Sequence, residues 1–94
     1  MSRSIDLHGM TVAQALDAFV RYYNDCLRAG YRDRIEVVHG YGSTGRGGVL
    51  LSAVRDYLRQ NSARLGSWVP GESVGNVGIT IVYPDKKLPA RASR

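Results

Sequence analysis

Apolar residues recur at helical spacing in two segments of the chain. Between residues 12 and 27 they follow three- and four-residue steps, and Gly30 stands where the C-terminal cap of a helix is expected. Thr11 and Gln14 form a capping box, which satisfies the free N–H groups at the start of a helix. The same spacing predicts a second helix over residues 49–61. Each helix is therefore expected to bury one face.

Four other segments have the alternation or the β-branched composition that is typical of strands. They are residues 4–8, 34–39, 65–69 and 77–83. The last of these is the most apolar, so we expect it in the centre of a sheet, antiparallel to its neighbours. Pro84 ends this strand, and the polar, basic residues 85–94 are predicted to form a flexible tail.

The resulting order, β-α-β-α-β-β, predicts an α/β domain that is an α+β two-layer sandwich with a four-stranded mixed sheet. Right-handed crossovers place both helices on one face of the sheet and leave the other face partly open. Four polar residues at alternate strand positions are assigned to that open face: Asp6, His8, Glu36 and Thr80. We expect one domain over residues 1–84, followed by the tail.

Composition narrows the classes of function. The net charge is +5, and eleven of the thirteen cationic residues are arginine. Arginine suits bidentate contacts with phosphate and favours a polyanionic partner, although a basic soluble domain has the same composition. Cys26, the only cysteine, is predicted to be a buried thiol in a reducing compartment. No apolar run approaches the ~20 residues of a membrane span and the N-terminus lacks a signal-peptide core, so we expect a cytoplasmic protein without a membrane partner. We also expect a monomer.

A glycine-rich segment separates the second predicted strand from the second helix. Five glycines lie between Gly40 and Gly48, and Arg46 adds a positive charge among them. Backbone N–H groups in such a loop, together with the N-terminus of the helix after it, can bind an anion. The segment is therefore predicted to recognise phosphate. Tyr41 either stacks on an exposed base or packs against the loop.

The only two histidines each follow a predicted strand and precede a glycine, as His8-Gly9 and His39-Gly40. Because the two strands run parallel, both histidines are expected at the sheet edge where ligands gather in open α/β sheets. Asp6 lies two residues before His8, so both side chains leave the same face of the strand. For each residue the alternative is structural, with the histidines as hydrogen-bonded strand terminators and Asp6 as a turn cap.

Other motifs fit this loop less well. Residues 40–45 match G-x-G-x-x-G, but a dinucleotide-binding fold needs more strands than this chain supplies. A P-loop requires Lys-Ser/Thr where Arg46 and Gly47 stand. Two histidines and one aspartate match no structural zinc spacing, and Ser43 lacks the surroundings of a nucleophile elbow.

Two motifs resemble those of the Smr (small MutS-related) domain family. Residues 5–9, Ile-Asp-Leu-His-Gly, match the family's Leu-Asp-x-His-Gly, with isoleucine in place of leucine. Residues 39–42, His-Gly-Tyr-Gly, and 44–47, Thr-Gly-Arg-Gly, match its His-Gly-x-Gly and Thr-Gly-x-Gly. The resemblance covers residues 5–83 and implies a domain similar to the C-terminal domain of translation initiation factor 3. Family members bind DNA or RNA, and several are endonucleases, including some that cleave messenger RNA on stalled ribosomes.

Carried over residue by residue, the resemblance makes Asp6 and His8 the catalytic-motif pair. It assigns to the substrate loop His39, Gly40, Gly42, Thr44 and Gly45. The loop departs from the family pattern because Ser43 and the Gly47-Gly48 pair make it longer than in many members.

Together these observations predict an endonuclease that cleaves phosphodiesters in DNA or RNA. Its predicted catalytic residues are Asp6, His8 and His39, and its phosphate-binding residues are Gly40, Tyr41, Gly42, Thr44, Gly45, Arg46 and Gly47. The nucleic-acid backbone is expected to contact Arg34, Arg55 and Arg59, the last two on the outer face of the second helix. Either His8 acts in acid–base chemistry with its tautomer set by Asp6, or the two hold Mg²⁺ or Mn²⁺. The alternatives are a nucleic-acid or ribosome binding module without chemistry, and a protein-interaction module.

Overall fold

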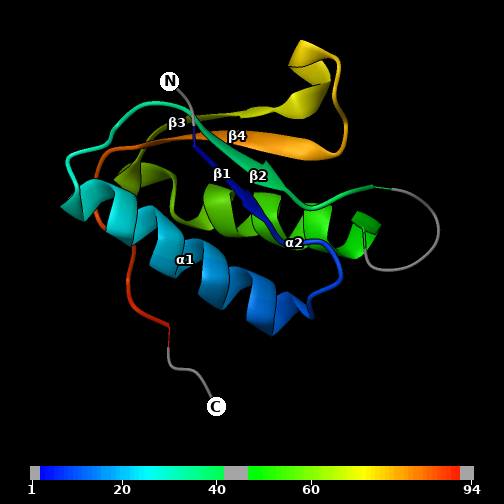
Figure 1. The fold of residues 1–94 in the computed structure, drawn as a ribbon, viewed down its shortest axis with the longest axis horizontal. Coiled ribbons are helices and arrows are strands. Elements are labelled where there is room, and N and C mark those ends of the chain that lie inside the picture. The colour runs from blue at the N-terminus through cyan, green and yellow to red at the C-terminus, as the bar shows by residue number, and fades with distance from the viewer. Residues whose placement is uncertain (1–2, 42–46, 92–94) are drawn as a thin grey trace.

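The computed structural model describes residues 3–41 and 47–91, and Figure 1 shows how their elements are arranged. The elements follow one another as β1 (Arg3–Asp6), α1 (Val12–Arg28), β2 (Ile35–Val38), α2 (Gly47–Gln60), η1 (Ser62–Arg64), β3 (Leu65–Pro70), η2 (Gly71–Val74) and β4 (Ile79–Pro84). The predicted order of strands and helices is confirmed, with strand ends that differ by one or two residues. Within the described ranges, no helix has the length and apolar character to cross a membrane.

The four strands form one mixed sheet in the order β1-β2-β4-β3. β2 runs parallel to β1, whereas β4 runs antiparallel to both β2 and β3. The most apolar strand is therefore central, as predicted. Its residues from Ile79 to Val82 are all buried, because neighbouring strands and the helices leave little of it exposed.

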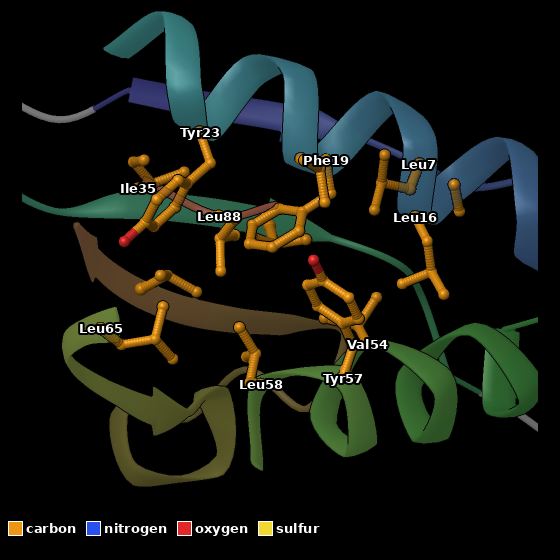
Figure 2. Close-up of a cluster of buried hydrophobic side chains, with 14 of the residues drawn as sticks. Leu7, Leu16, Phe19, Tyr23, Ile35, Val54, Tyr57, Leu58, Leu65 and Leu88 are labelled. Atoms are coloured by element: carbon orange, nitrogen blue, oxygen red, sulfur yellow. The ribbon is translucent and has the colours of Figure 1, made fainter. Parts of the chain in front are cut away.

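Both helices pack on the same face of this sheet and build one core with it. Val37 and Val82 from the sheet cluster with Phe19 of α1 and Leu58 of α2. Figure 2 shows side chains of the two helices pointing into the same space. The predicted capping box begins α1, since the Thr11 hydroxyl accepts the Gln14 N–H at 3.1 Å and the Gln14 side chain accepts the Thr11 N–H at 3.1 Å. Cys26 is buried in α1, as expected.

The assignment of Thr80 to the open face is wrong. Thr80 pairs with Val37 of β2 and has no exposed surface. Paired residues of antiparallel strands point to the same face, so Thr80 points toward the helices. Glu36 pairs instead with Ile81 and lies on the face away from the helices, as predicted. Alternation could not reveal the phase of β4, because apolar residues occupy both of its faces.

Residues 85–91 differ from the predicted flexible tail. Leu88 is fully buried in the core, and its backbone N–H and C=O bond to the side chain of Asn24 in α1 at 2.9 and 3.0 Å. The Tyr23 hydroxyl donates to the Lys86 carbonyl at 2.7 Å. These hydrogen bonds and the buried Leu88 side chain hold the segment against α1. They outweigh its polar, basic composition, which predicted a flexible tail. Residues 92–94 lie outside the described residues.

Candidate functional site at the ends of β1 and β2

β1 and β2 end side by side, and both helices begin at the same edge of the molecule (Figure 1). Beyond the last residue of β1, the Leu7 N–H still donates to the Val38 carbonyl at 2.7 Å. The chain then turns through Gly9, whose φ of 82° is a conformation that glycine adopts without strain. Gly40 has a φ of 78° after β2. The two His-Gly pairs therefore follow neighbouring strands, as the sequence predicts.

Asp6 and His8 form an exposed, hydrogen-bonded pair. Nδ1 of His8 lies 2.7 Å from Oδ1 of Asp6, and the His8 backbone N–H donates to the same oxygen at 3.1 Å. The hydrogen bond with the His8 ring lowers the pKa of the Asp6 carboxyl the most, and the hydrogen bond from the His8 backbone N–H lowers it further. The carboxyl is therefore ionised near neutral pH. A carboxylate only accepts hydrogen bonds, so the proton lies on Nδ1. Nε2 of the neutral ring then keeps its lone pair.

The pair is closer than a continuous strand allows. Two residues that share a strand face stand roughly 7 Å apart along the chain. Because β1 ends at Asp6, the turn at His8 and Gly9 folds the imidazole back onto the carboxylate. The side chains of His8 and Asp6 are 74% and 57% exposed, so an incoming molecule can reach both.

His39 has a different environment from His8. It is fully buried, with Nδ1 2.7 Å from the Gly40 carbonyl and Nε2 2.8 Å from the Thr80 hydroxyl. The carbonyl can only accept, so Nδ1–H donates to it and Nε2 accepts the Thr80 hydroxyl proton. Burial lowers the pKa of His39 and keeps the ring neutral. Neither ring nitrogen is free for a substrate, so the structure separates the two histidines that the sequence grouped as catalytic.

Arg55 lies behind His39, and its predicted position on the outer face of α2 is wrong. Its side chain is only 9% exposed, and Nε donates to the Thr80 hydroxyl at 2.9 Å. The guanidinium also forms a bidentate pair with Glu72 at 2.8 and 3.0 Å and donates to the Ile79 carbonyl. This pairing lowers the pKa of Glu72 to about 2. We refer to Arg55, Glu72, Thr80 and His39 as the Arg55 network.

Neither Thr80 nor Glu72 was predicted as a site residue, so the sequence did not reveal the Arg55 network. The two residues differ in how much their positions in the sequence indicate. Thr80 lies within an apolar strand, where a buried hydroxyl requires a hydrogen-bond partner, so its position was informative. Glu72 lies in η2 after β3, and nothing in its local sequence points to an arginine in α2.

The other two predicted backbone contacts lie away from Asp6 and His8. Arg34 precedes β2, and the length of this strand, about 13 Å, separates it from the edge where the site lies. Its guanidinium pairs with the Glu36 carboxylate at 3.1 Å. Arg59 lies in the last turn of α2, about 18 Å along the helix from its first residue. It pairs with Asp56 at 2.7 Å and covers the ring of Trp68. The structure therefore does not gather these arginines around the pair.

The predicted phosphate loop is described only at its ends. The N–H groups of His39 and Gly40 both donate to the Gly78 carbonyl, at 3.1 and 3.0 Å, which fixes the chain as it leaves β2. Tyr41 follows and is 63% exposed. Gly42, Thr44, Gly45 and Arg46 lie outside the described residues. Gly47 is the first residue of α2, so the helix begins two residues earlier than predicted.

Comparison with known proteins places these motifs in a family. The family model of the Smr domain matches residues 5–84. Endonuclease MutS2 of Thermomicrobium roseum is 38% identical over 80 residues, which are 84% of this chain and 9% of that protein. An uncharacterised protein of Treponema pallidum is 31% identical over 86 residues, covering 90% of this chain and 42% of that one. The chain thus spans less than half the length of these relatives.

The fold is also found in a solved structure. The crystal structure of the Smr domain of Thermus thermophilus MutS2 superimposes with a TM-score of 0.70 and 32% identity. The match covers 87% of this chain and 96% of that domain.

Proposed function

The chain belongs to the Smr domain family, and on this premise we propose that it binds nucleic acid and acts as an endonuclease on DNA or RNA. The observation that carries the proposal is the exposed Asp6–His8 pair, in which a carboxylate orients an imidazole with an accessible nitrogen. The relative from T. roseum is named an endonuclease. A net charge of +5, mostly from arginine, favours a polyanionic substrate.

In this mechanism Nε2 of His8 accepts the proton of the attacking oxygen, which belongs to water or to a ribose 2′-hydroxyl. That oxygen bonds to phosphorus, and the P–O bond to the leaving oxygen breaks. The leaving oxygen then takes a proton from the His8 imidazolium or from water. Asp6 holds Nδ1–H throughout and stabilises the positive charge that the ring acquires.

Mg²⁺ or Mn²⁺ is a candidate cofactor at the same place. The Asp6 carboxylate is ionised and exposed, and such oxygens suit a hard divalent cation that keeps waters and substrate phosphates as its other ligands. Asp6 and His8 would be its protein ligands, and within the described residues no three His, Cys, Asp or Glu side chains form a metal-binding group. The ion would activate water and neutralise developing phosphate charge.

One observation favours a second candidate, a nucleic-acid or ribosome binding module without chemistry. Acid–base cleavage commonly uses one group to remove a proton and another to supply one. Of the two histidines, only His8 is accessible, since both nitrogens of His39 are engaged inside the protein. A binding module needs only the basic surface and the loop.

Cleavage of end-labelled single- and double-stranded RNA and DNA tests the proposal. The wild type is compared with His8→Ala and Asp6→Asn, each with Mg²⁺, with Mn²⁺ or with EDTA. We expect His8→Ala to lower the cleavage rate about 10²- to 10⁴-fold, the usual contribution of an acid–base group. Arg28→Ala is the matched control, because it removes an exposed charge in the last turn of α1, at the end of that helix away from the site.

Each outcome assigns a mechanism. Cleavage of RNA that survives EDTA indicates acid–base chemistry by His8, whereas dependence on Mg²⁺ or Mn²⁺ indicates the metal route. Equal cleavage by the wild type and both site variants would overturn the assignment of Asp6 and His8. Salt-sensitive binding without cleavage by any of the proteins would establish the binding module instead.

A further inference from the structure

Tyr41 presents a large aromatic side chain at the edge that carries the Asp6–His8 pair. Three large apolar side chains are exposed among the described residues, namely Tyr41 at 63%, Val49 at 56% and Val74 at 51%. Tyr41 follows the end of β2, and Val49 lies in the first turn of α2, so both are near the edge where β1 ends. Of the three, only Tyr41 has an aromatic ring, and an exposed aromatic ring can stack on a base.

The backbone beneath Tyr41 is held in place by hydrogen bonds. The carbonyl of Gly78 accepts the N–H groups of His39 and Gly40 at 3.1 and 3.0 Å, and the Gly78 N–H donates to the Asn76 side chain at 3.0 Å. A Cβ atom placed on Gly78 would lie 3.7 Å from Cδ1 of Tyr41. One edge of the ring therefore lies close to a glycine that adds no side chain of its own, and most of the residue is exposed.

Tyr41 is also within reach of a nucleotide held at the Asp6–His8 pair. Asp6 lies directly beside Val38 on the neighbouring strand, and Tyr41 is three residues beyond Val38. Adjacent strands are about 4.8 Å apart, and three residues span at most about 10 Å. The Cα atom of Tyr41 thus stands within about 15 Å of that of Asp6, a separation that a short stretch of single strand can bridge.

We propose that Tyr41 is a stacking platform for an unpaired base, and that it directs this domain to single-stranded or locally unpaired nucleic acid. Both faces of a base inside a duplex are covered by its neighbours, whereas a base in a single strand can stack on an aromatic ring. The proposal rests on the nucleic-acid binding proposed above but not on cleavage. Stacking on one aromatic side chain changes affinity by about 5- to 150-fold.

Binding measurements in the His8→Ala background test the proposal without degrading the probe. Fluorescence anisotropy compares one 12-nucleotide strand, as RNA and as DNA, with the same strand in a duplex. A 2-aminopurine in the strand reports stacking by quenching of its fluorescence. Tyr41→Leu keeps an apolar side chain but cannot stack, whereas Tyr41→Phe keeps the ring. Val49→Ala removes an exposed apolar group from the same edge and serves as the matched control.

We expect Tyr41→Leu to weaken single-strand binding at least 5-fold, to change duplex binding less than 2-fold and to abolish the quenching. Tyr41→Phe and Val49→Ala should bind both forms as the parent does. Unchanged single-strand binding by Tyr41→Leu, or an equal loss on single strand and duplex, would overturn the stacking role. Absence of cleavage by the wild type overturns the endonuclease proposal alone, because this assay reads binding.

Discussion

The two His-Gly pairs follow neighbouring parallel strands, yet they have opposite environments. His8 lies in an exposed turn, bonded through one nitrogen to a carboxylate, with its other nitrogen open to solvent. His39 is buried, and both of its nitrogens are bonded within the protein. The same dipeptide at equivalent places in the sheet therefore has two uses. One histidine is available for chemistry, and the other supports the turn that begins the glycine-rich segment.

The difference arises from the elements that pack against the end of each strand. β1 is an edge strand, so the residues after it have a neighbour on one side only. β2 lies between β1 and β4. β4 brings Thr80 against His39, and Gly78, the residue before β4, accepts the His39 N–H. Arg55 of α2 then satisfies the Thr80 hydroxyl from the other side. A histidine in the interior of the sheet is engaged by its surroundings, whereas one beside an edge strand stays accessible.

The largest expected effect is the difference in stability between the two histidine-to-alanine variants. His39→Ala should lower the free energy of unfolding by about 2–4 kcal/mol, because it opens a cavity and removes the ring nitrogens that bond to the Thr80 hydroxyl proton and the Gly40 carbonyl. His8→Ala should change it by no more than about 0.5 kcal/mol, as is usual for exposed positions. Denaturant unfolding of the two variants measures the difference.

A control separates the cavity from the hydrogen bonds. Thr80→Val keeps the volume of residue 80 but removes the hydroxyl that joins His39 to Arg55, so it should cost about 1–3 kcal/mol. Equal stability of the two alanine variants would mean that the Arg55 network does not support the fold.

A smaller effect is expected from pH. Burial lowers the pKa of His39 in the folded protein below its ordinary value of 6.5. As the pH falls through 6.5, the unfolded chain binds a proton that the folded chain does not, so stability should decline toward acid. The decline is at most about 1.4 kcal/mol per pH unit, the bound for one proton. Denaturation midpoints between pH 7.5 and 5 should show this slope in the wild type and in His8→Ala but not in His39→Ala.

The smallest effect on stability is expected at a buried polar group that, unlike those of the Arg55 network, has no hydrogen-bond partner within the described part of the chain. The Tyr57 hydroxyl is buried and has no hydrogen-bond partner among the described residues. Figure 2 shows it beside Phe19, whose ring centroid lies 6.4 Å from that of Tyr57. Tyr57→Phe should therefore keep or raise the free energy of unfolding, by up to about 1 kcal/mol. A loss above 1 kcal/mol in thermal or denaturant unfolding would show that the hydroxyl has a partner.

Local pattern was sufficient for most of the fold. The 3.6-residue period and the Thr11–Gln14 capping box predicted α1, and the apolar run of residues 77–83 predicted a central strand. These predictions succeeded because helix caps and burial of apolar side chains depend on residues close in sequence. Asp6 and His8 were found for the same reason, since they are two residues apart and their contact is local.

The tertiary structure decided the contacts between distant residues. Arg55 is 25 positions from Thr80 and 17 from Glu72, so no local pattern in α2 could reveal that its guanidinium is buried and paired. Leu88 enters the core from a segment that is polar overall. The sequence by itself determined the elements, their order and the exposed Asp6–His8 pair. Packing decided which histidine stays accessible, because the burial of His39 depends on β4 and α2 meeting at the end of β2.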